Sequence, residues 1–114
     1  MPTKIALMWS APSSIALAPF DDPNWEIWGC SPGLYGSLIQ RNRVPEAWFE
    51  LHRWEPPVLG KADQQVPWFS PEYVAWMGQL PVTVWMERKI DAIPASQALP
   101  WQQLCEKYGH FFFT

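Results

Sequence analysis

Residues whose side chains could do chemistry follow the first apolar run of this sequence. The run "KIALMW", residues 4–9, leads into the small and hydroxyl-bearing loop Ser10, Ala11, Pro12, Ser13 and Ser14. Free backbone N–H groups at a helix start favour an anion, and small residues let it approach closely. The loop over 10–14 therefore predicts either a phosphate-binding turn or a plain turn, with Ser13 or Ser14 capping a short helix.

Glu50 and His52 are the one acid–base neighbourhood that the sequence suggests. Residues two apart on a strand face the same side, so these two side chains could interact. Histidine titrates near neutral pH and can act as a base or hold a phosphate. The alternative is a histidine that caps a loop carbonyl at the strand end. If the strand of His52 lies near the first strand, His52 and the loop over 10–14 should frame one pocket.

Cys30 and Cys105 are the two cysteines of the chain. They are far apart and lack the spacing of metal ligands, so we expect free thiols and no metal site. Cys30 leads into Ser31 and Pro32 at the end of a second apolar run. It could be a nucleophile if His52 stabilised its thiolate, or simply a small buried residue.

Aromatic and acidic residues extend this set. The chain holds nine tryptophans, and Trp54 lies just past the run that contains His52. It could stack on a base ring, or it could cover the sheet as an apolar residue. Glu87 follows the apolar run over 82–86. Because ligands of open parallel sheets bind beyond the carboxyl ends of the strands, these positions are expected to line one rim.

The apolar runs predict the elements that must position these residues. Strands are expected over 4–9, 25–30, 47–52, 82–86 and 110–113, and helices over 70–80 and 101–108. Segments 31–46 and 87–100 are expected to be loops, the first with one helical turn. Apolar rather than alternating runs, separated by helices or long crossovers, are typical of a parallel sheet covered on both faces.

The predicted fold is therefore α/β: a Rossmann-like three-layer sandwich with a mostly parallel sheet of about five strands. A length of 114 residues indicates one domain over 1–114. A Pro-rich surface loop is expected over about 53–69.

Composition excludes several classes of protein. A hydrophobic fraction of 48% argues against disorder, and a net charge of −3 leaves no basic stripe for a nucleic-acid backbone. No run approaches the roughly 18 apolar residues of a membrane span. The apolar part of the N-terminus is too short for a signal peptide. We expect a cytoplasmic protein without membrane or nucleic-acid partners.

Several stretches carry a resemblance to a known family. They are "KIALMWSAPSS", "DPNWEIWGCSPGLYG", "AWFELHRW", "FSPEYVAWMGQLPVTVWM" and "YGHFFFT". Together they resemble, over nearly the whole chain, a family of uncharacterised proteins of tailed bacteriophages and prophages. That family continues past the "FFFT" point, which implies that this chain is a shortened version. The resemblance also implies a bacterial host cytoplasm as the setting.

The first strand, its turn and the second strand show a more distant resemblance. They are similar to the nucleotide-binding half of bacterial sialyltransferases and of hydroxymethylpterin-diphosphokinase-like proteins. In those groups the turn reads Gly-Pro-Ser and faces nucleotide phosphate or sugar, whereas Ala11 stands here in place of the glycine. This resemblance implies a nucleotide ligand at the turn.

Residues and resemblance together predict an accessory protein of a phage or prophage that binds a nucleotide or nucleotide-sugar. The expected binding residues are Ser10, Ala11, Pro12, Ser13, Ser14, Cys30, Ser31, Pro32, His52, Trp54 and Glu87. Glu50 and His52 are the candidate catalytic residues. Because no complete nucleophile–base–orienter set can be assembled, we expect binding without catalysis and no cofactor beyond the nucleotide.

Two other functions stay open. One is docking of a host or phage protein through a Trp-rich surface, and the other is a glycosyl- or phosphotransferase activity. A homo-oligomer is also expected, because a shortened sheet leaves an open edge and uncovered apolar surface.

Overall fold

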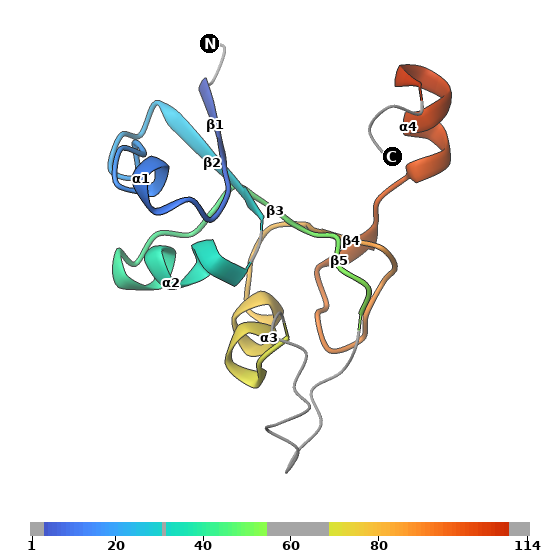
Figure 1. Ribbon diagram of the computed structural model, residues 1–114. Helices are drawn as coiled ribbons and strands as arrows, with labels where there is room; N and C mark the ends of the chain where they lie inside the picture. The colour runs from blue at the N-terminus through green and yellow to red at the C-terminus, as the bar shows by residue number, and fades with distance from the viewer. Residues whose placement is uncertain (1–3, 31, 55–68, 110–114) are drawn as a thin grey trace.

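The computed structural model describes residues 4–30, 32–54 and 69–109, and these form one five-stranded parallel sheet with helices on its two sides (Figure 1). The elements run β1 (Lys4–Met8), α1 (Pro12–Ile15), β2 (Trp25–Cys30), α2 (Pro32–Gln40), β3 (Ala47–Glu50), α3 (Pro71–Gly78), β4 (Val84–Met86), β5 (Ser96–Ala98) and α4 (Trp101–Tyr108). The small α/β fold with a parallel sheet, predicted from the sequence, is confirmed.

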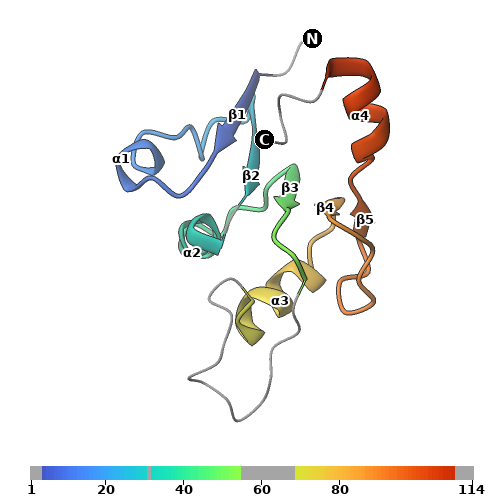
Figure 2. The ribbon, with the colours of Figure 1, turned by 45° about the vertical axis from the view of Figure 1, so that its right-hand side comes forward.

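The strands lie in chain order, β1-β2-β3-β4-β5, and every neighbouring pair is parallel. Because crossovers between parallel strands are right-handed, this order places the connecting helices on one face. Helices α1, α2 and α3 accordingly lie on one side of the sheet, and α4 lies on the other (Figures 1 and 2). The strand order never reverses, so the sheet lacks the crevice that a reversal creates in doubly wound folds.

The core lies between the sheet and the three helices α1–α3. Side chains on alternate strand positions point to this side. The fully buried ones include Ile27, Trp48, Val84 and Met86 from strands, and Leu34, Leu38, Tyr73 and Met77 from helices.

The opposite side of the sheet is less well covered. Its most exposed apolar side chains are Ile5 (41%), Leu7 (62%), Trp9 (61%) and Leu51 (42%). Of the described helices only α4 lies on this side, and none of its residues is buried. The apolar strands are thus fully covered on one face only, whereas the sequence pattern predicts cover on both.

The predicted boundaries of most elements are confirmed to within two residues. Strands over 4–9, 25–30, 47–52 and 82–86 are found as β1, β2, β3 and β4. The helix over 70–80 is α3, where the Ser70 side chain accepts a hydrogen bond from the Tyr73 N–H at 3.2 Å and Pro71 begins the helix. The helix over 101–108 is α4, and Gly109 follows it with a φ of 88°.

Two elements differ from the prediction. Segment 31–46 holds the nine-residue helix α2 instead of one turn, because buried Leu34 and Leu38 anchor it despite its glycines. Segment 87–100 holds β5 instead of a loop. The Ser96 hydroxyl accepts from the Ile90 N–H at 2.8 Å and donates to the Ile90 carbonyl at 3.0 Å, which fixes this polar strand.

The predicted strand over 110–113 and most of the predicted surface loop lie outside the described residues.

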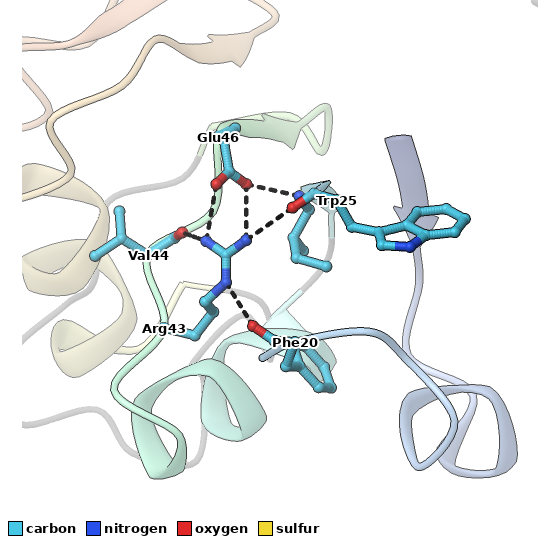
Figure 3. Close-up of polar contacts among 6 residues, drawn as sticks. Phe20, Trp25, Arg43, Val44 and Glu46 are labelled. Carbon is cyan, nitrogen blue, oxygen red and sulfur yellow. Dashed lines mark hydrogen bonds and ion pairs between the residues drawn. The ribbon is translucent and has the colours of Figure 1, made fainter. Parts of the chain in front are cut away.

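A cluster of polar contacts joins the amino ends of β2 and β3 (Figure 3). The Arg43 guanidinium donates to the carbonyls of Phe20 at 2.9 Å, Trp25 at 3.3 Å and Val44. It also pairs with the Glu46 carboxylate at 2.9 Å. Glu46 in turn accepts a hydrogen bond from the Ile27 N–H at 2.6 Å. One side chain therefore fastens three separate segments at this edge of the sheet.

Gly29 gives a direct test of core packing. A Cβ at this position would lie 2.5 Å from Leu34 Cδ2 and 2.7 Å from Trp48 Cζ3. We expect Gly29→Ala to lower the free energy of unfolding by about 2 kcal/mol, because the rigid indole cannot move aside. The measurement is equilibrium urea unfolding.

Gly36→Ala is the matched control for this substitution. A Cβ at Gly36 meets nothing within 4 Å. In the middle of α2 the added methyl should raise stability by up to about 1 kcal/mol. Equal effects of the two substitutions would contradict the described packing around Gly29.

Candidate binding site at the carboxyl edge of the sheet

A hollow lies where β1, β2 and β3 end. It has a volume of about 410 Å³ and is lined by Trp9, Cys30, Phe49, Glu50, Leu51 and His52. Trp9, Phe49 and Leu51 belong to the less covered side of the sheet, whereas Glu50 shares the helix side with Trp48. The hollow therefore joins an apolar wall to an acidic and imidazole-bearing end. We call it the carboxyl-edge hollow.

A chain of hydrogen bonds runs from the core to this hollow. Trp48 Nε1 donates to the Tyr73 hydroxyl at 3.0 Å, and that hydroxyl donates to Glu50 Oε2 at 2.9 Å. The other oxygen of Glu50 lies 2.6 Å from His52 Nδ1. Glu50 is 1% exposed, so its carboxylate depends on these partners in place of water. We call these four residues the polar relay.

Burial and the charge of Glu50 keep two groups beside this carboxylate protonated, the Tyr73 hydroxyl and the Cys30 thiol. Burial, and then the Glu50 charge, raise the pKa of Tyr73 far above its ordinary value, so this phenol stays a neutral donor. The same two causes, in the same order, raise the pKa of Cys30 to about 11. A thiol in this environment is protonated at neutral pH, which is unfavourable for a nucleophile.

The loop over 10–14 lies beside the hollow without lining it. Its residues Ser10, Ala11, Pro12, Ser13 and Ser14 are all exposed. The prediction that Ser13 or Ser14 caps the helix is wrong. Ala11 occupies the N-cap without a side-chain hydrogen bond, and Pro12 begins α1 because its fixed φ suits the first helical position.

The loop instead approaches α2. A Cβ on Gly33 would lie 2.5 Å from the Ser10 Cβ, so the two backbones pass very close together. His52 follows β3, which is two places away from β1 because β2 lies between them. The pocket that contains His52 reaches Trp9 and not the loop, which corrects the expectation of one pocket framed by both.

Trp54 and Glu87, two further predicted binding residues, contact each other away from the hollow. The Trp54 backbone N–H donates to Glu87 Oε1 at 2.8 Å, and the Trp54 ring packs edge-on against Phe69 at 4.9 Å. Neither Trp54 nor Glu87 lines the carboxyl-edge hollow. Pro32 begins α2, and Ser31 lies outside the described residues.

Of the predicted set, the structure thus brings Cys30, Glu50 and His52 together, and it adds residues that the sequence reasoning missed. Trp9, Phe49 and Leu51 fall within the predicted strands over 4–9 and 47–52, and Tyr73 falls within the predicted helix over 70–80. A signal for the first three was the alternation along each strand, which places them opposite the buried positions. A signal for Tyr73 was its hydroxyl, because a buried phenol needs a polar partner.

Within residues 4–30, 32–54 and 69–109, no group of three His, Cys, Asp or Glu side chains could hold a metal ion. None of the described helices has the length and apolar character needed to cross a bilayer. Comparison of the chain with family models, curated proteins and solved structures gives no significant match in any of the three.

Proposed function

We propose that this protein binds a nucleotide or nucleotide-sugar in the carboxyl-edge hollow. The observation that supports this most is the presence of an exposed Trp9 ring and of His52, held by Glu50, in one hollow. An aromatic ring that is 61% exposed offers a face for a base, and such stacking contributes roughly 1–3 kcal/mol per base. The apolar edges of Phe49 and Leu51 extend this wall.

The polar end of the hollow suits hydroxyl groups. The buried Glu50 carboxylate disfavours a phosphate placed directly against it, since both are negative. A sugar hydroxyl can instead bond to the imidazole of His52, whose side chain is 40% exposed. The ligand is therefore proposed to direct its sugar toward His52, whose ring Glu50 holds, with the base on Trp9 and the phosphates toward solvent.

The protein is proposed to bind its ligand without converting it. Glu50 and His52 have the arrangement of an orienting carboxylate and a base, at 2.6 Å. The neighbouring thiol of Cys30 has a pKa raised to about 11 and so makes a poor nucleophile.

The setting proposed from the family resemblance is the cytoplasm of a bacterium that hosts a phage.

The test is a thermal-shift screen of nucleotides and nucleotide-sugars, followed by calorimetric titration of any hit. We expect Trp9→Ala to weaken binding about 10- to 100-fold, because the stacking surface is lost. Leu17→Ala is the control, since Leu17 is 87% exposed and lies outside the hollow. An unchanged affinity of Trp9→Ala, or no binding by any nucleotide at millimolar concentration, would contradict the proposal.

A protein partner is the second candidate function. The exposed apolar side chains of β1, Ile5 and Leu7, favour it, because such surface is uncommon on a monomer. The same screen separates the two candidates. A docking surface without a ligand site gives no nucleotide-dependent stabilisation.

A further inference from the structure

A second hollow opens beside the carboxyl-edge hollow. It has a volume of about 290 Å³, and we call it the apolar hollow after the side chains that form its walls: Leu7, Trp9, Trp28, Cys30, Phe49 and Leu51. Four of these six also line the carboxyl-edge hollow, namely Trp9, Cys30, Phe49 and Leu51. Because the two hollows share so much of their walls, they are the two ends of one trough.

The walls of the apolar hollow come from the side of the sheet opposite α1–α3, because they occupy alternate strand positions. Met8 and Gly29 also border it, but they do so with their backbone. Met8 is buried, and a Cβ on Gly29 would meet Leu34 on the helix side. The rings of Trp28 and Phe49 are half-buried and their centroids lie 6.1 Å apart, so the sheet presents two fixed aromatic groups here.

The described residues that line the apolar hollow offer little that could read the polar edge of a ring. None of the six side chains carries an oxygen, and their only nitrogens are the indole N–H groups of Trp9 and Trp28, which donate but cannot accept. In β2, Trp28 and Gly29 have strand partners on both sides, so their backbone groups are used in the ladders. Since bases differ in the donors and acceptors along their edges, this wall cannot tell them apart.

We infer that the apolar hollow is a subsite for a flat aromatic ring, which it holds by the faces of the ring without reading its edge. The inference rests on the proposed function, in which this ring is the base and the sugar reaches His52 at the other end of the trough. Leu7 and Trp9 are 62% and 61% exposed, so a ring that lies on them keeps its polar edge in water. Every base has a π-face, and stacking of this kind therefore tolerates any base. The protein is expected to accept all four common bases and to select its ligand by the sugar.

The first test is calorimetric titration with the diphosphates of adenosine, guanosine, cytidine and uridine, which share the sugar and the phosphates. Their affinities should lie within about 10-fold of one another, with the purines bound most tightly because they stack over a larger area. A site that reads a polar edge by hydrogen bonds rejects the wrong ligand by a factor on the order of 10⁴. One base preferred by about 100-fold or more would therefore overturn the inference.

Leu7→Gln tests the wall itself, because Leu7 lines the apolar hollow but not the carboxyl-edge hollow. The amide makes this wall polar, so all four diphosphates should bind about 10-fold more weakly. Ile5→Gln is the matched control. Ile5 lies two residues away on the same side of β1, is 41% exposed and lines neither hollow, so this variant should bind like the wild-type chain. Circular dichroism checks that both variants are folded, and an unchanged affinity of Leu7→Gln would overturn the subsite.

A probe that is not a nucleotide separates a failure of this inference from a failure of the proposed function. Anilinonaphthalene sulfonate fluoresces on apolar protein surface. It should bind the wild-type and Ile5→Gln chains, bind Leu7→Gln about 10-fold more weakly, and be displaced by the nucleoside diphosphates.

The possible outcomes then differ. A probe that binds in this pattern while no nucleotide binds supports a ring subsite and contradicts the proposed ligand. Nucleotide binding that neither displaces the probe nor responds to Leu7→Gln supports the ligand and overturns the subsite. A chain that binds neither the probe nor a nucleotide contradicts both.

Discussion

Replacing Arg43 with methionine is expected to lower the free energy of unfolding by about 3 kcal/mol. The methionine keeps the apolar volume of the stem but removes every donor of the guanidinium. The carbonyls of Phe20 and Trp25, which accept from Arg43 at 2.9 and 3.3 Å, lose these partners, and the Glu46 carboxylate loses its cation. Equilibrium urea unfolding measures the change.

Arg41→Met is the matched control. Arg41 lies two residues away, is exposed, and stands over the Phe20 ring at 4.6 Å. An exposed contact of this type contributes about 1 kcal/mol or less. Arg43→Lys should recover only part of the loss, because one ammonium cannot reach carbonyls on three segments. If the two methionine variants are equally stable, the contacts of Arg43 do not hold the sheet together.

Tyr73→Phe is expected to lower the free energy of unfolding by about 2–3 kcal/mol. The ring volume is kept, so the packing of Tyr73 against Tyr35 at 4.9 Å is unaffected. The loss comes from the missing hydroxyl, which leaves Glu50 Oε2 and the Trp48 N–H without their partner, whereas Glu50 Oε1 keeps its contact with His52. Tyr35→Phe is the control, since the Tyr35 hydroxyl is not part of the polar relay, and it should cost less than about 0.5 kcal/mol.

The same substitution has a pH signature. The pKa of Tyr73 is raised in the folded state, so the unfolded chain releases this proton near pH 10 while the folded chain keeps it. Stability from this source is therefore present below pH 10 and falls as the pH rises above it. Urea titrations between pH 8 and 11 should show a shallower decline for Tyr73→Phe than for the wild-type chain. Parallel declines would contradict the burial of the phenol.

The sequence predicted the elements with strong local signals. Ser70 and Pro71 mark the start of α3, Gly109 follows α4, and the apolar runs identify four of the strands. The prediction failed where tertiary contacts override a weak local pattern. β5 is polar and depends on the buried hydroxyl of Ser96, and α2 contains glycines but is anchored by Leu34. Neither contact is visible in a pattern of apolar residues.

The sequence predicted only part of the candidate site, because some of its contacts join segments that are far apart in the chain. Strand alternation was enough to pair Glu50 with His52, because the two are close in sequence. Tyr73 reaches Glu50 from a helix 23 residues further along the chain, and no local spacing indicates that contact. The order of strands also decides which strand ends meet, and that order put β2 between the loop over 10–14 and His52.

The chain order of the strands has a consequence for how this sheet forms and opens. Each strand pairs with the strand next to it in the sequence, so assembly pairs only consecutive strands, which keeps contact order low for a parallel sheet. Opening can proceed in the same stepwise manner. The short edge strand β5, Ser96–Ala98, can detach while β1, β2 and β3 stay paired, so its amide hydrogens should exchange through local opening rather than global unfolding.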